Sequence, residues 1–351
     1  MIYKKEDAVM TRGLAILAMV VLHLFCRKGE DVFGTPLLWV NETTPLVYYF
    51  GFFAEICVPI YSLCAGYARA LGCAQGRETW RGNLKRILRL MENYWIILVL
   101  FSILGLIFDR TGSIPGTPLN FLKSVFLLHS YNGAWWYLNT YILTLLIPAS
   151  VLLLPVKKLR GFGGFAVFFG YDLLWYLIER LGLWPSSTVP VIAFVLKEAN
   201  NLLGILAWYW AGAYICKENC LDRAAAWIET HIRAQWQKPF LLLCFAALFI
   251  GFNLLQKAVL AGAGGVLTFF LFNLWNKSAN TKKIFLFLGK HSTNIWLVHM
   301  FFYHTLFTGL VCFAKYPILI LASLLILCIS FSYIVLFLHN RLSSAFSQIS
   351  T

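Results

Sequence analysis

Long apolar runs recur along almost the whole chain and alternate with short polar loops. A helix needs about 20 apolar residues to cross the hydrocarbon core of a bilayer, because it rises about 1.5 Å per residue. We therefore predict an all-α, polytopic membrane protein of about ten transmembrane helices, forming a single domain over residues 1–351. The predicted spans are residues 9–26, 46–71, 93–109, 134–155, 161–180, 201–216, 239–255, 257–275, 292–313 and 317–338.

The composition supports this class and sets an orientation. The chain is 60% hydrophobic and 13% charged, which leaves too few charges to cover a water-facing surface. With the N-terminus inside, the 29 Lys and Arg residues divide into 21 on the inner side and 8 on the outer side. This bias predicts an N-in, C-in protein of the plasma membrane. It also accounts for the net charge of +14, so we expect lipids and no nucleic acid as partners.

Two inner loops carry an amphipathic pattern, near residues 77–92 and 218–237. In the first loop, apolar residues recur at helical spacing from Trp80 to Met91, and basic residues occupy the other flank. We expect both segments to form helices that lie on the cytoplasmic surface of the membrane.

The first span contains two ionisable residues. Arg12 and His23 bracket ten residues that are almost wholly aliphatic. In a helix the eleven steps between them cover roughly 16 Å, which places His23 near the bilayer midplane when Arg12 lies at the membrane edge. An ionisable group at that depth is a functional candidate. The alternative is a signal peptide or a plain anchor. The sequence argues against a signal peptide, because no small-residue cleavage site follows Phe25.

Three further patterns stand out along the chain. An apolar run from Cys57 to Tyr67 contains Pro and Gly, and a basic segment, Lys85-Arg86-Ile87-Leu88-Arg89, follows it. Trp135-Trp136-Tyr137 begins a later span. The sequence Leu288-Gly289-Lys290-His291-Ser292 leads into a span that contains His299.

Taken in this order, the four patterns resemble those of acyltransferase family 3, whose members move acyl groups, commonly acetyl, onto extracytoplasmic glycans. The resemblance covers nearly the whole chain. It implies acetyl-CoA or another acyl-CoA as the donor, a catalytic histidine matching His23, and donor-binding arginines matching Arg12, Arg86 and Arg89. Two positions depart from the pattern: Val9 stands where members often carry an acidic residue, and Ala65 where they carry Ser.

The chemistry of the arginines agrees with the resemblance. Arg86 and Arg89 lie one turn apart on one helix face, and the planar fork of Arg suits the phosphates of coenzyme A. The alternative is that these side chains bind anionic lipid headgroups.

His23 suits the work of a general base, because neutral imidazole can take a proton from an attacking hydroxyl. Glu55 lies roughly 13 Å from the outer face, against roughly 14 Å for His23, so we expect Glu55 to orient the imidazole. His299 also lies near mid-membrane and is either a structural hydrogen-bond donor or part of a cavity lining. Trp136 and Tyr137 either pack at the membrane interface or flank the pantetheine arm or the acceptor sugar. We predict no metal site.

These observations predict a membrane O-acyltransferase, specifically an O-acetyltransferase, that acts on the hydroxyl of an extracytoplasmic or lipid-linked glycan. A transporter or flippase for a glycolipid or anion is the main alternative, although the chain lacks the repeated halves and paired broken helices typical of that class. The other alternative is a non-catalytic module that resembles an acyltransferase. The sequence argues against it, because it keeps Arg12, His23, Arg86 and Arg89.

Overall fold

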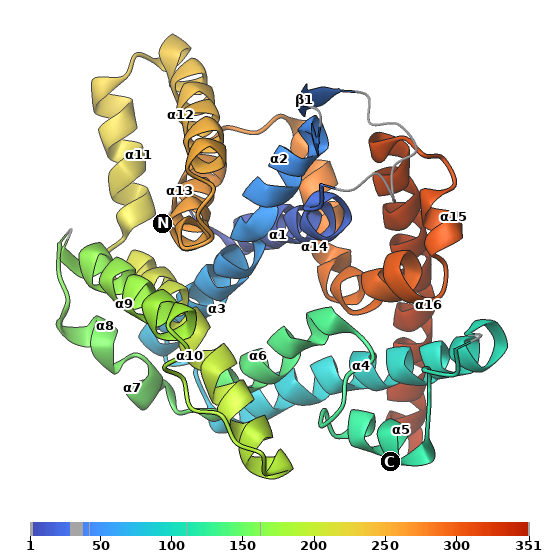
Figure 1. Cartoon of the computed structure of the whole chain (residues 1–351). Coiled ribbons are helices and arrows are strands. Elements are labelled where there is room, and N and C mark those ends of the chain that lie inside the picture. Colours follow the sequence, from blue (N-terminus) through green and yellow to red (C-terminus); the bar gives the residue numbers. More distant parts are fainter. Residues whose placement is uncertain (1–2, 29–37, 42, 110, 162, 350–351) are drawn as a thin grey trace. The chain divides into compact units, whose positions relative to one another are not determined.

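The computed structural model describes residues 3–28, 38–41, 43–109, 111–161 and 163–349. In this part of the chain nearly all regular structure is helical (Figure 1), which agrees with the all-α prediction. A short antiparallel pair of strands, β1 (Trp39–Asn41) and β2 (Thr44–Pro45), precedes the second helix. The chain divides into two compact units.

The first unit comprises Met1–Cys26, Tyr48–Trp80 and Ile147–Lys290. Its long helices are α1, α3, α9, α10, α12 and α13, and α14 begins in it. The bounds are α1 (Lys5–Phe25), α2 (Leu46–Phe53), the 3-10 helix η1 (Ala54–Ile56), α3 (Cys57–Ala74), α7 (Ala149–Leu152), α8 (Leu154–Lys158), α9 (Gly163–Arg180), α10 (Pro190–Lys217), α11 (Cys220–His231), α12 (Ala234–Leu255), α13 (Leu260–Leu274) and α14 (Ala279–Met300).

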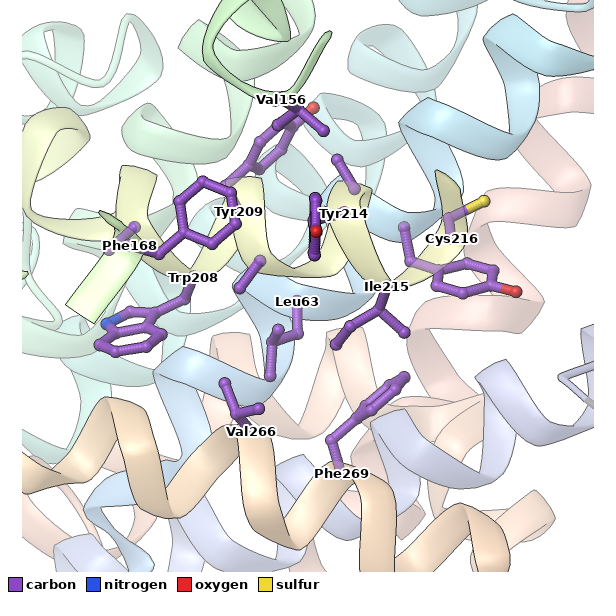
Figure 2. Close-up of a cluster of buried hydrophobic side chains, with 14 of the residues drawn as sticks. Leu63, Val156, Phe168, Trp208, Tyr209, Tyr214, Ile215, Cys216, Val266 and Phe269 are labelled. Carbon is purple, nitrogen blue, oxygen red and sulfur yellow. The ribbon is translucent and has the colours of Figure 1, made fainter. Parts of the chain in front are cut away.

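The core of this unit forms where α3 crosses α10. A Cβ atom on Gly66 of α3 would lie 1.8 Å from the carbonyl oxygen of Tyr209, and one on Gly212 of α10 would lie 2.0 Å from that of Leu63. Only glycine allows two helix backbones to come this close, which is a common device in membrane helix packing. Buried aromatic residues gather around the crossing (Figure 2), among them Phe168, Trp208, Tyr209, Tyr214 and Phe269.

The second unit comprises Arg27–Val47, Arg81–Leu146 and His291–Thr351. It contains almost all of α4, and the last part of α14 belongs to it. The bounds are α4 (Trp80–Phe108), α5 (Pro118–Val125), the 3-10 helix η2 (Gly133–Trp135), α6 (Trp136–Leu146), the π-helix η3 (Phe301–Thr305), α15 (Thr308–Cys312) and α16 (Pro317–Ile349).

The end of α14 is the centre of packing in the second unit. Asn132 Nδ2 and Trp135 Nε1 both donate to the carbonyl oxygen of Leu297, each at 3.0 Å. The ring of Phe101 stacks on that of Phe301, with centres 4.2 Å apart. These contacts satisfy a carbonyl at the point where α14 gives way to the π-helix, whose hydrogen-bond pattern leaves the α-helical ladder.

Six helices in the described part of the chain are long and apolar enough to cross a membrane. They are Lys5–Phe25, Leu46–Ala74, Trp80–Phe108, Pro190–Lys217, Ala234–Leu255 and Pro317–Leu342, and the shorter apolar helix Leu260–Leu274 adds to them. The chain is therefore a multi-pass membrane protein. The predicted count of ten spans is not confirmed, and the membrane sides of the termini stay a prediction.

Two predicted spans are interrupted in the structure. The helix predicted over residues 134–155 stops at Leu146, and Pro148 follows, which lacks the N–H that a continuing helix needs. The helix predicted over residues 292–313 is the end of α14 followed by the π-helix and α15. Of the two expected surface segments, residues 80–92 form the first turns of α4, and α11 lies within 218–237.

Candidate functional site

Arg12 and His23 lie on one uninterrupted helix, α1, in the first unit. The Arg12 side chain is exposed and the His23 side chain is half-buried. Ten residues lie between them, and the eleven helical steps from Arg12 to His23 cover about 16 Å. The turn that carries Arg12 is anchored by its neighbour Thr11, whose Oγ1 donates to Asn273 Oδ1 of α13 at 3.2 Å. The helix thus holds a cation at one depth and an imidazole at another.

Glu55 lies in a tightened turn of the second predicted span. The α-helix changes to the 3-10 helix η1 at Ala54–Ile56. Pro59 explains the change, because proline has no N–H to donate to the carbonyl of Glu55 four residues earlier, and its ring crowds that carbonyl. The Glu55 side chain is half-buried. The irregular turn therefore presents an acidic side chain inside an apolar segment.

Helix α1 packs against η1, so the segments that carry His23 and Glu55 lie together. The end of α1 also meets α2 at Gly51, where a Cβ atom would lie 2.4 Å from the backbone nitrogen of Cys26. Glu55 is four residues beyond Gly51, and His23 is three residues before Cys26. The two segments thus lie together, and the pairing of the His23 and Glu55 side chains stays a prediction.

Arg86 and Arg89 lie on α4, in the second unit. Both side chains are exposed, and they lie three positions apart in the sequence, so they share a helix face. Arg86 Nη1 donates to Asn83 Oδ1 at 3.0 Å, and Asn83 Nδ2 donates to the carbonyl oxygen of Leu145 at 3.2 Å. The chain of hydrogen bonds restrains one of the two guanidinium groups, which can then bind an anion with less loss of side-chain entropy.

Trp136, Tyr137 and His299 also lie in the second unit. Trp136 is half-buried and Tyr137 is buried, with the Tyr137 ring edge-on to that of Trp296 at 5.9 Å. His299 is fully buried, its Nδ1 lies 2.8 Å from the carbonyl oxygen of Trp296, and its ring stacks on Tyr303. These contacts favour a packing role for Tyr137 and a structural hydrogen bond for His299.

The predicted residues thus divide between the units. Arg12, His23 and Glu55 belong to the first, and the predicted residues of α4, α6 and α14 belong to the second. Among the described residues no group of three or more His, Cys, Asp or Glu side chains is arranged to hold a metal ion. The first unit carries an imidazole and a carboxylate on segments that pack together, and the second carries two arginines of a kind suited to phosphate.

Comparison with known families decides the class of the protein. A family model described as an acyltransferase domain, that of acyltransferase family 3, matches residues 10–337. The chain belongs to acyltransferase family 3. The match begins two residues before Arg12 and ends inside α16, so it takes in every predicted site residue. No curated protein and no solved structure matches the chain significantly.

The sequence did not predict the structural role of one charged residue of this family 3 acyltransferase, Arg69. Arg69 of α3 is buried, and its Nε lies 2.7 Å from Glu78 Oε1. Its Nη2 donates to the carbonyl oxygen of Ile147 at 2.9 Å. Arg69 therefore ties the end of α3 to the loop that precedes α4 and to the segment that leads into α7. The only signal in the sequence was an arginine inside an apolar helix, which was counted as an inner-side charge.

Lys277 is the second charged residue that the sequence interpretation missed. Its Nζ donates to the carbonyl oxygens of Phe272 and Trp275 at the end of α13, and lies 4.1 Å from the centre of the Phe272 ring. Burial lowers the pKa of Lys277 to about 8, and the negative charge of Asp7 on α1 opposes that shift. The lysine thus closes the C-terminal end of α13 beside the start of α1.

Proposed function

We propose that this acyltransferase transfers an acyl group, acetyl by preference, from acyl-CoA to a hydroxyl group of an extracytoplasmic or lipid-linked glycan at the plasma membrane. The observation that carries the proposal is α1, a single helix with exposed Arg12 near its start and half-buried His23 eleven residues further on. Such a helix suits a reaction whose anionic donor binds at the membrane edge while the acyl group reacts deeper in.

Arg12, Arg86 and Arg89 bind the donor in this proposal. Coenzyme A carries a 3′-phosphate and a pyrophosphate, and arginine binds phosphate through paired, charge-assisted hydrogen bonds. All three side chains are exposed, as a site for a water-soluble donor requires. The pantetheine arm is then long and apolar enough to carry the thioester into the membrane domain.

His23 acts as the general base. Its neutral imidazole accepts the proton of the acceptor hydroxyl as the oxygen attacks the thioester carbon. A new C–O bond forms, the C–S bond breaks, and the imidazolium returns the proton to the departing thiolate, so that free CoA and the ester leave. Glu55 orients the imidazole, and the packing of α1 on η1 supports this role.

The test measures CoA thiol released by the purified chain in lipid nanodiscs. The probes are acetyl-CoA and the methyl glycosides of glucose, galactose, rhamnose and N-acetylglucosamine, with the acetylated product identified by mass spectrometry. The wild type is expected to release thiol and form product, and His23→Ala is expected to do neither. His231→Ala on α11 is the matched control, because this exposed histidine has no role in the proposal and should leave turnover unchanged.

A second variant tests the orienting role of Glu55. Glu55→Gln should bind acetyl-CoA as the wild type does and turn over more slowly, because losing an orienting group costs the transition state more than the ground state. Equal turnover in the wild type and His23→Ala would refute the assignment of the base. Movement of a fluorescent glycolipid across the bilayer, with no thiol released in the presence of any acceptor, would establish a flippase instead.

A further inference from the structure

Helices α9 and α10 lie side by side in the first unit (Figure 1) and run antiparallel. The pairing is fixed along its length by hydrogen bonds. Tyr171 Oη donates to the carbonyl oxygen of Leu203 at 3.0 Å, and Asn200 Nδ2 donates to Glu179 Oε1 at 2.7 Å. The register between the two helices is therefore well defined, and polar side chains on each can be matched to those on the other.

Polar side chains concentrate on the faces that meet. On α9, Asp172, Trp175 and Glu179 follow at spacings of three and four residues, so they share one face. On α10, Asn201 shares a face with Gly204 and Trp208, three and seven residues further on.

Contacts across the pair bring these two faces together. A Cβ atom on Gly204 would lie 3.3 Å from Trp175 Nε1, and the Trp208 side chain hydrogen-bonds the Asp172 carboxylate. We call Asp172, Trp175, Glu179, Asn200 and Asn201 the α9–α10 polar cluster.

The cluster is not satisfied by the protein. Trp175 Nε1, Asn200 Oδ1 and Asn201 Nδ2 are buried atoms that have no hydrogen-bond partner among the described residues. A buried donor or acceptor without a partner costs about 1–3 kcal/mol, so most such groups in folded proteins bond to something. Glu198 Oε2, in the same turn of α10, is also buried without a partner among the described residues. Two donors and two acceptors thus lie within one turn of α10 and the facing turn of α9, and a partner that both accepts and donates suits them.

We propose that the α9–α10 polar cluster binds a sugar ring, as a subsite for the glycan acceptor. Each sugar hydroxyl can donate one hydrogen bond and accept others, which suits the mixed donors and acceptors of the cluster. Carboxylates, amides and the indole N–H give a sugar hydrogen bonds that fix its orientation, while the Trp175 ring itself packs on Tyr171 and Trp184. The cluster lies in the unit that carries His23. The proposal rests on the proposed function, since it names where that function's acceptor binds.

The test measures sugar binding directly and without acyl-CoA. Saturation-transfer NMR is recorded on the chain in lipid nanodiscs free of sugar detergent, with the methyl glycosides of glucose, galactose, rhamnose and N-acetylglucosamine as probes. We expect transfer from the wild type to at least one glycoside. Trp175→Phe removes the indole N–H and keeps an aromatic ring, while Asn201→Leu replaces the amide by an apolar side chain of similar size. Each should weaken that binding about tenfold, as expected for the loss of one buried hydrogen bond.

Thermal unfolding separates a ligand site from a structural one. Without ligand, Asn201→Leu should unfold at or above the temperature of the wild type, because it removes a polar atom that has no partner among the described residues. Trp175→Phe also loses ring contacts with Tyr171 and Trp184, so it should unfold somewhat below the wild type. Asn253→Leu on α12 is the matched control: its Oδ1 is also buried and lacks a partner in the described part of the chain. This variant should bind the glycoside as the wild type does.

Three outcomes overturn the inference. The first is no transfer to any glycoside. The second is wild-type binding by both variants. The third is a clear loss of ligand-free stability in Asn201→Leu, which would mean that ordered water completes a structural network. The proposed function has its own readout in thiol release. Sugar binding without thiol release supports the sugar subsite and contradicts the proposed transfer from acyl-CoA. Thiol release with a wild-type KM for the acceptor in both variants supports the proposed transfer and contradicts the subsite.

Discussion

Gly51 and Cys26 lie so close that one more carbon atom between them does not fit. A Cβ atom on Gly51 would lie 2.4 Å from the Cys26 nitrogen and 2.5 Å from the carbonyl carbon of Phe25. Both neighbours are backbone atoms, so a rotamer change cannot make room. Because His23 and Glu55 lie within four residues of this contact, the closeness of α1 and α2 controls how the segments that carry them are placed.

Replacing Gly51 therefore tests the alignment of the proposed base and its partner. Gly51→Ala should push the end of α1 away from α2 and lower turnover by about 100-fold, because a displacement of about 1 Å in a catalytic group has an effect of that order. Acyl transfer is measured at matched protein levels, with helical content followed by circular dichroism. Gly251→Ala on α12 is the control, since an added Cβ there meets nothing within 4 Å. Wild-type turnover in Gly51→Ala would show that the contact has no bearing on the reaction.

The arginines of α4 should act on donor affinity. Arg86→Ala and Arg89→Ala each remove a charged group from the proposed phosphate site, which is worth about 1.5–3 kcal/mol per lost hydrogen bond. The KM for acetyl-CoA should rise by roughly 10- to 100-fold with kcat little changed. Arg81→Ala, also exposed on α4, serves as the control. Unchanged donor KM combined with an altered dependence on anionic lipid would assign the two arginines to the membrane surface.

The sequence predicted the features of this protein that depend on local pattern. The spacing of Arg12 and His23 predicted one helix, and α1 is continuous through both residues. The 3-10 turn at Glu55 was not predicted, although its cause, Pro59, was visible as a break in an apolar run. A proline disturbs the turn before it, so the irregularity fell on the acidic residue rather than on the proline.

Features that depend on partners distant in the sequence were not predictable. The sequence indicated Arg69 only as one of the inner-side charges, because its position relative to Glu78 and Ile147 depends on how α3 ends. The polar residues of α10 carry no separate signal in a hydropathy plot, since Asn200 and Asn201 follow the charged pair Lys197 and Glu198 in one polar break between apolar runs. Asn200 and Asn201 become part of a cluster only because the packing of α9 on α10 places Trp175 and Glu179 opposite them.

The ion pair between Arg69 and Glu78 should matter for stability. Both side chains are almost fully shielded from solvent, with 3% and 11% of their areas exposed. Glu78→Ala leaves a buried guanidinium without its carboxylate, so it should lower the free energy of unfolding by about 3–5 kcal/mol. The double variant Arg69→Met, Glu78→Leu should recover much of that loss, because it removes both charges. Apparent melting temperatures in nanodiscs check both expectations, and a double variant no more stable than Glu78→Ala would contradict them.

Lys277 should give the stability of the protein a distinct dependence on pH. Its pKa is lowered to about 8 by burial, so above that pH the folded chain has lost a proton that the unfolded chain still binds. Stability therefore rises with pH between about 8 and the ordinary range of lysine, and the full cost of burying the charge is present below that window. The apparent melting temperature should increase from about pH 8 to about pH 10 in the wild type and stay flatter in Lys277→Met. Lys283→Met, at an exposed position on α14, should keep the wild-type slope. Equal slopes in the wild type and Lys277→Met would show that another group titrates in this range.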